Sequence, residues 1–148
     1  MADLSIEREI VIDAPADVVW RTITEPDQIT RWFADRVELD LREGGAGILV
    51  FEGKMTAPLV VVAVEPPRRF SFRWCHPDGE APVAGNSVLV EFTLTEEASD
   101  RTRLRVTETG LDTIGWPDED TTRYAEEHRD GWAEFFGRLE DLFAATAT

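Results

Sequence analysis

The stretch YAEEHRDGWAEFFGRLEDLF, residues 124–143, decides the fold. Its bulky side chains recur every three or four residues, which is the spacing of one face of an α-helix. These side chains are Tyr124, His128, Trp132, Phe135, Phe136, Leu139, Leu142 and Phe143. The pattern predicts one long helix with an apolar, aromatic face near the end of the sequence.

Residues 37–109 follow a different period. Apolar and polar residues alternate there in short runs separated by Gly, Pro, Asn and Asp, which is typical of β-strands joined by turns. In one of these runs Phe70, Phe72 and Trp74 share a face, because side chains alternate sides along a strand. Short turns make neighbouring strands antiparallel, so we predict an antiparallel meander of about six strands.

The sequence before the meander predicts a strand and two short helices. Residues 6–12 alternate as a strand, and Pro15 suits the first turn of a helix. Thr24 has the form of a capping residue that starts a second helix. We therefore expect an α+β fold, in which a curved sheet of about seven strands wraps around the long C-terminal helix. Two short helices follow the first strand, and residues 1–148 form a single domain.

Composition limits the partners. The sequence has 15 basic and 30 acidic residues and a net charge of −15, a field that repels phosphate backbones and anionic lipid. We expect neither nucleic acid nor a membrane as a partner, whereas the acidic surface could meet a basic protein. The lone Cys75 excludes an internal disulfide, and the N-terminus lacks a signal-peptide pattern, so a cytoplasmic location is expected.

Five segments resemble one known family. They are residues 10–20 (IVIDAPADVVW), 24–33 (TEPDQITRWF), 64–74 (VEPPRRFSFRW), 102–111 (TRLRVTETGL) and 128–139 (HRDGWAEFFGRL). Together and in this order they resemble the AHSA1-like (activator of Hsp90 ATPase homologue 1-like) family. That family belongs to the START/Bet v 1-like (SRPBCC) superfamily of helix-grip folds, which includes lipid carriers, polyketide cyclases, hormone receptors and cochaperones.

The resemblance implies a hydrophobic cavity between the sheet and the long helix. The inward aromatic residues that we expect to line it are Trp32, Phe51, Phe72, Trp74, Phe92, Trp132 and Phe136. Each of them is also an ordinary core residue, so the set rather than any single member carries the prediction. Gly131 lies inside the predicted helix, where Gly costs about 1 kcal/mol relative to Ala. Its missing side chain either leaves room for a ligand beside Trp132 or allows close packing.

Charged residues on the inward face offer polar anchors. By the alternation of side chains along their strands, Arg8 and Glu108 both fall on the inner face of the predicted sheet. Charged groups are rarely buried unless they are paired. In a helix-grip topology the first and last strands are neighbours, so we predict that Arg8 and Glu108 approach each other. The pair is either a structural ion pair or an anchor for a ligand, and His76 is a third candidate.

Other chemistry finds little support in the sequence. The two histidines and the one cysteine lack metal-ligand spacing, so we expect no metal and no other cofactor. Cys75 and His128 would form a nucleophile and base only if they met in space. On the apolar face of the helix, His128 is interpreted as a hydrogen-bonded core residue.

Three functions follow, from different classes. The first is non-enzymatic binding of a hydrophobic or amphipathic small molecule in the cavity, by a monomer or weak homodimer. The second is a polyketide cyclase- or aromatase-like enzyme, which needs a general acid or base in the pocket, with His76, Glu108 and Arg8 as candidates. The third is an Hsp90-type chaperone-interacting protein that uses its acidic surface.

Overall fold

The structure is a computed structural model that describes residues 5–53, 55–74, 82 and 86–146. Its elements follow in the order β1 (Ile6–Ile12), α1 (Ala16–Thr24), α2 (Pro26–Ile29), β2 (Arg36–Leu39), β3 (Ala46–Phe51), β4 (Met55–Glu65), β5 (Arg69–Trp74), β6 (Val88–Ala98), β7 (Arg101–Thr109), the 3-10 helix η1 (Leu111–Thr113) and α3 (Asp118–Thr146). This order confirms the predicted strand, two short helices, meander and long helix.

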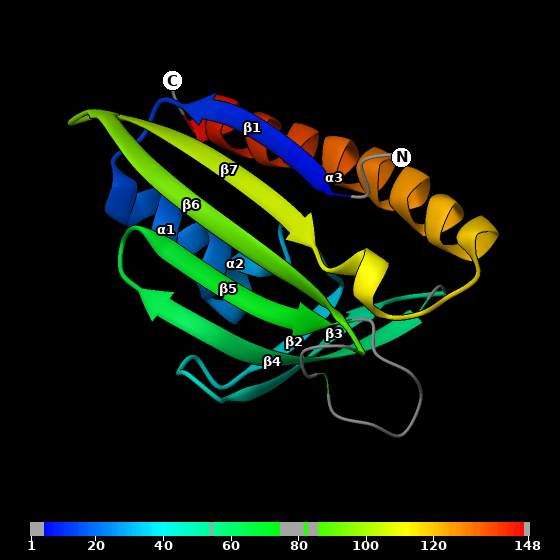
Figure 1. Cartoon of the computed structure of the whole chain (residues 1–148). Helices are drawn as coiled ribbons and strands as arrows, with labels where there is room; N and C mark the ends of the chain where they lie inside the picture. Colours follow the sequence, from blue (N-terminus) through cyan, green and yellow to red (C-terminus); the bar gives the residue numbers. More distant parts are fainter. Residues whose placement is uncertain (1–4, 54, 75–81, 83–85, 147–148) are drawn as a thin grey trace.

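The seven strands form one antiparallel sheet in the order β1-β7-β6-β5-β4-β3-β2. Strands 2 to 7 are the meander, and β1 returns to pair with β7. Figure 1 shows the curvature of the sheet and all three helices on one of its faces, with α3 running alongside β1. The helix-grip α+β fold expected from the sequence is confirmed.

Helix α3 packs its aromatic face against the sheet, as the period of the sequence predicts. Trp132, Phe136 and Leu139 are at most 2% exposed. On the sheet side, Phe72 and Trp74 of β5 are buried as well. Burial of one large apolar side chain contributes roughly 1.5–3 kcal/mol, so this contact is a main source of the stability of the fold.

The boundary between the first two helices differs from the prediction. Thr24 does not cap a new helix but ends α1, where its hydroxyl donates to the carbonyl of Trp20 at 2.7 Å. Helix α2 begins instead at Pro26, whose lack of an N–H costs nothing in a first turn. The hydroxyl therefore serves a carbonyl of the preceding turn rather than a free amide of the next helix.

The interior between sheet and helices is filled rather than hollow. Aromatic side chains of the turn after α2, of β5 and of β6 meet there, among them Trp32, Phe70 and Phe92, with ring centroids of neighbouring pairs 6.2–6.3 Å apart. The cavity that remains, called the inner void, has a volume of about 10 Å³. A void of this size holds at most about one water molecule, so the hydrophobic cavity that the resemblance implies is not formed at this place.

Candidate functional site

The site is built around a buried carboxylate, that of Glu108 on β7. This side chain is only 2% exposed. Its Oε2 accepts hydrogen bonds from Trp74 Nε1 at 2.8 Å and from the Tyr124 hydroxyl at 2.7 Å. Its Oε1 lies 3.0 Å from both Trp132 Nε1 and His128 Nδ1. Four donors thus surround one carboxylate, which is how a buried charge avoids a large desolvation cost.

Three of the four donors come from a single stripe of α3. Tyr124, His128 and Trp132 follow at intervals of four residues, so they lie one above the other on the same helix face. The rings of Tyr124 and His128 are stacked, with centroids 3.6 Å apart. The fourth donor, Trp74, comes from the end of β5. Glu108 therefore connects α3 with two strands that are not neighbours in the sheet.

Electrostatics keep this carboxylate ionised. Burial raises the pKa of Glu108, but the hydrogen bond and the charge of His128, together with hydrogen bonds from Tyr124 and Trp132, outweigh burial and hold that pKa below its ordinary value. An ionised carboxylate only accepts hydrogen bonds. Nδ1 of His128 must therefore carry the hydrogen of the His128–Glu108 bond, and in the neutral ring Nε2 is left as an acceptor.

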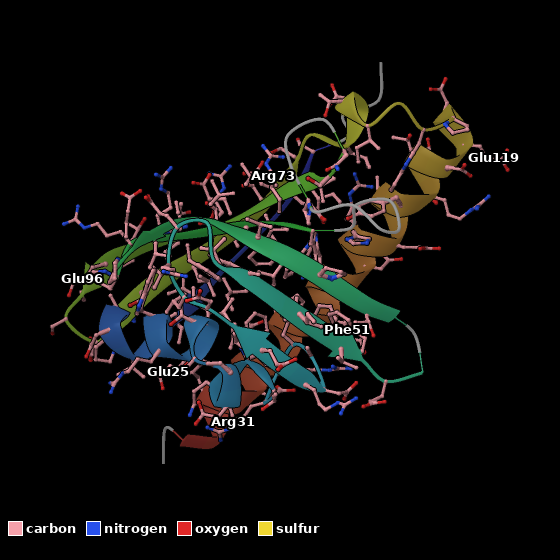
Figure 2. All side chains as sticks on the ribbon, turned by 90° about the horizontal axis from the view of Figure 1, so that it is seen from below. Glu25, Arg31, Phe51, Arg73, Glu96 and Glu119 are labelled. Atoms are coloured by element: carbon pink, nitrogen blue, oxygen red, sulfur yellow. The ribbon has the colours of Figure 1, made fainter. Side chains whose placement is uncertain are left out.

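A pocket opens beside these donors, and we call it the outer pocket. It has a volume of about 180 Å³. Its lining consists of Phe51, Trp74, Glu127, His128, Gly131, Trp132 and Phe135. Figure 2 shows Phe51 at the end of β3 on the side of α3, where its ring centroid lies 6.1 Å from that of Phe135. The pocket is mainly aromatic and has two polar residues, a composition typical of small-molecule sites.

The structure divides the aromatic residues that the sequence singles out between two places. Phe51, Trp74 and Trp132 line the outer pocket. Trp32, Phe72 and Phe92 line the inner void. Phe136 is fully buried between Trp32 and Trp132, with ring centroids 6.4 and 6.2 Å away. Whether any of them contacts a ligand stays a prediction.

The predicted approach of Arg8 to Glu108 is wrong. β1 and β7 are neighbours as expected, but the residue opposite Glu108 is Ile6, and Arg8 lies opposite Val106. Arg8 is exposed to solvent, as the edge position of β1 allows for a long side chain. Glu108 takes its hydrogen bonds from neutral aromatic donors and His128 instead.

His76 and Cys75 lie outside the described residues. The interpretation of His128 as a hydrogen-bonded core histidine is half right: it bonds to Glu108, but its side chain is 19% exposed and lines the outer pocket. The polar ends of Tyr124, His128 and Trp132, four residues apart, were the available signal for this role. Combined with an inward-facing glutamate, they indicate donors that converge on a carboxylate.

Phe33 is a residue that sequence reasoning did not assign to the site. Its ring centroid lies 4.9–5.8 Å from those of Phe51, Trp74, Trp132 and Phe135, and its side chain also borders the inner void. Phe33 thus separates the outer pocket from the interior. No spacing in the sequence distinguishes this role from that of an ordinary core residue.

The fold and this site define a helix-grip protein with a small aromatic pocket. The model of the family described as "Activator of Hsp90 ATPase homolog 1-like protein" matches residues 13–144. The chain belongs to this family. A search of the curated proteins found no significant match.

Solved structures agree with this assignment. Protein MLL2253 from Mesorhizobium loti superposes with a TM-score of 0.79 at 26% identity, over 97% of this chain and 99% of that one. CalU16 from Micromonospora echinospora has 30% identity and a TM-score of 0.68, and the match covers 94% of this chain and 74% of CalU16. DynU16, from the dynemicin biosynthetic locus, has 26% identity and a TM-score of 0.73, and the match covers 95% of this chain but 47% of DynU16.

Neither a metal-ion site nor a membrane-spanning helix is found among the described residues. No group of three or more His, Cys, Asp or Glu side chains in the described part of the chain is arranged to hold a metal ion. None of the helices there is both long enough and apolar enough to cross a bilayer.

Replacing Glu108 with Gln should lower the free energy of unfolding by about 2–4 kcal/mol. An amide keeps the shape, but its NH₂ group replaces one carboxylate oxygen and cannot accept from the two donors that this oxygen serves, so buried donors lose their partners. Urea unfolding measures the change. Glu96→Gln is the matched control, because Glu96 is exposed on β6, and it should change stability by under about 0.5 kcal/mol. Equal effects of the two substitutions would contradict the structural role of Glu108.

The stability contributed by Glu108 should also depend on pH. Because its pKa is lower in the folded protein, its contribution is complete above the ordinary value of 4.5 and is lost as the pH falls through the folded value. The difference in unfolding free energy between wild type and Glu108→Gln should therefore stay constant from pH 7 to about 5 and shrink below about 4.5. Unfolding curves at several pH values measure it, and a difference that grows toward low pH would refute the assignment.

Proposed function

We propose that this protein binds a small apolar or amphipathic molecule in the outer pocket. The observation that carries the proposal is the lining of this pocket, in which four aromatic side chains occur together with the partly exposed His128. A cavity of roughly 150 Å³ accommodates one benzene ring, so the volume of about 180 Å³ suits a ligand built around a single ring or a group of similar size.

Burial of the ligand's apolar surface supplies most of the affinity in this proposal. His128 adds direction, because Nε2 can accept a hydrogen bond from a hydroxyl group of the ligand. The bond between Nδ1 and Glu108 fixes the ring orientation before any ligand arrives, which reduces the entropy lost on binding. The location of DynU16 within a biosynthetic locus supports a role in small-molecule chemistry for this kind of protein.

Gly131 allows a direct test of the pocket. A Cβ at this position would meet only Phe135 Cε2, at an ordinary 3.8 Å, and a Cβ at Gly137 would meet nothing within 4 Å. Gly131→Leu should therefore fold and fill the outer pocket, whereas Gly137→Leu leaves the pocket open. Both should gain up to about 1 kcal/mol of helix stability.

With 4-fluorobenzyl alcohol as the ligand, fluorine NMR titration should show binding to wild type and Gly137→Leu, and at least a tenfold loss in Gly131→Leu. A loss of tenfold corresponds to about 1.4 kcal/mol. Native mass spectrometry of freshly purified protein adds an independent measurement, because a co-purifying molecule should be absent from Gly131→Leu alone. Equal binding by both variants would refute the proposal that this pocket is the binding site.

A second candidate function is acid–base catalysis of the cyclase or aromatase type. One observation favours it: a histidine that lines the pocket donates Nδ1–H to a buried, ionised carboxylate, the arrangement that orients a general base. Nε2 would then remove a proton from a carbon next to a ketone of the ligand. This candidate assigns the role of base to His128, instead of Arg8, Glu108 or His76, the three residues named from the sequence.

Proton exchange tests this candidate without knowledge of the natural substrate. In D₂O the wild-type protein should accelerate deuterium incorporation at the methylene group of 1-phenylpropan-2-one, as followed by proton NMR. His128→Gln should lower the enzyme-dependent rate by about 10²-fold or more while it still binds 4-fluorobenzyl alcohol. Exchange at the buffer rate with wild type would rule out this chemistry and leave binding as the function.

A further inference from the structure

The described lining of the outer pocket carries acidic charge and no lysine or arginine charge. Glu127 stands among its lining residues, and the described lining includes neither Lys nor Arg. The ionised Glu108 carboxylate lies directly behind two walls of the pocket, since it accepts the indole hydrogens of Trp74 and Trp132. When His128 is protonated, its charge is balanced by Glu108 at 3.0 Å. The described lining of the pocket is therefore negative or neutral, in a chain of net charge −15.

Four aromatic rings of the lining form a closed circuit, which we call the aromatic box: Phe51, Trp74, Trp132 and Phe135. The centroids of successive rings are 6.4 Å apart for Phe51 and Trp74, and 6.1 Å for each of the other three sides. The rings come from β3, β5 and α3, so the tertiary fold holds the box together. Phe33 closes its inner side, with its centroid within 5.8 Å of all four.

Aromatic faces attract cations, because the quadrupole of the ring places negative charge above its plane. One ring of the box already makes such a contact: the guanidinium carbon of Arg138 lies 5.5 Å from the Phe135 centroid. The charge of Arg138 is balanced by Glu134, whose Oε1 lies 2.8 Å from Nη2, so it does not reverse the sign of the neighbouring pocket.

We propose that the ligand of the outer pocket is a small organic cation, a methylated ammonium group on a short apolar or hydroxylated chain. This inference rests on the proposed function and adds the chemical class of the ligand. The four aromatic rings of the lining, Glu127 and the buried charge of Glu108 all favour a positive group in this volume. An anionic ligand of the same size meets none of these attractions and is repelled by both carboxylates.

Methylation follows from the scarcity of polar partners. A primary ammonium carries three N–H donors, and the described lining offers only the Glu127 carboxylate and His128 Nε2 as side-chain acceptors. A donor left without a partner in an apolar site costs affinity. A quaternary ammonium has no N–H, spreads its charge over its methyl groups and leaves Nε2 for a hydroxyl elsewhere in the ligand.

Choline and its uncharged isostere 3,3-dimethylbutan-1-ol test the charge preference, because they differ in one atom, nitrogen against carbon. Titration calorimetry at low salt should give choline an affinity at least about tenfold higher. Glu127→Gln should reduce that preference about threefold, since an exposed carboxylate contributes modestly. Glu126→Gln is the matched control. It removes the same charge from the residue directly before Glu127 in α3, which is exposed and does not line the outer pocket.

The results separate the cation proposal from the proposed binding function. Equal affinity for the two compounds overturns the cation proposal, and so does an equal loss from Glu126→Gln and Glu127→Gln, because the effect would then be that of overall charge. If 4-fluorobenzyl alcohol binds and choline does not, the cation proposal fails while the proposed binding function stands. Choline binding that survives in Gly131→Leu would place choline outside the pocket and overturn the cation proposal, whereas the proposed binding function is decided by 4-fluorobenzyl alcohol with the same variant.

Discussion

The ionised carboxylate of Glu108 is the constraint on which the rest of the site depends. A buried charge persists only when hydrogen bonds replace its water, and here Trp74, Tyr124, His128 and Trp132 supply all four. Satisfying this one group fixes the rotation and the position of α3 along the sheet, because three donors spaced four residues apart must all reach it. The same requirement orients the His128 ring, turns the indole hydrogens inward and leaves the rings of Trp74 and Trp132 to form walls of the outer pocket. Trp74, His128 and Trp132 therefore both satisfy Glu108 and line the outer pocket, so a change at Glu108 affects the stability of the fold and the shape of the pocket together.

The way in which the interior is filled determines what kind of binding is available. A helix-grip fold places a concave sheet against a long helix, but in this protein Trp32, Phe33 and Phe92 occupy most of the space between them. Among the described residues, the inner void lies beneath α1 and α2. The outer pocket is larger than the inner void and lies near the middle of α3, where Gly131 lacks a side chain and Phe33 closes the inner side. A ligand of one ring or one methylated ammonium group matches this volume, whereas a multi-ring substrate would require Phe33 to move.

Much of the architecture could be predicted because it depends on local periodicity. The three-to-four-residue spacing of Trp132, Phe136 and Leu139 requires a helix with one apolar face, and the alternation of Phe70, Phe72 and Trp74 requires a strand whose inner face is aromatic. The site was only partly predictable. The alternation of side chains along a strand placed Glu108 on the inner face, but it places Arg8 there too. The exposed side chain of Arg8 shows that an edge strand lets a long residue return to solvent. The exact start of α2 was also missed, because a threonine hydroxyl can serve either the helix before it or the helix after it, and hydrogen-bond geometry alone separates the two.

The sequence by itself determined the order of the elements, the antiparallel sheet, the burial of the aromatic face of α3 and the acidic character of the chain. These follow from periods of two and 3.6 residues and from a count of charges, which need no knowledge of contacts distant in the sequence. Only the tertiary structure decided that Glu108 meets four donors from α3 and β5, that His128 faces a pocket and that Phe33 closes it. The reason is that these contacts join residues from 16 to 34 positions apart around Glu108, and side-chain volume and hydrogen-bond geometry select them only after the helix lies across the sheet.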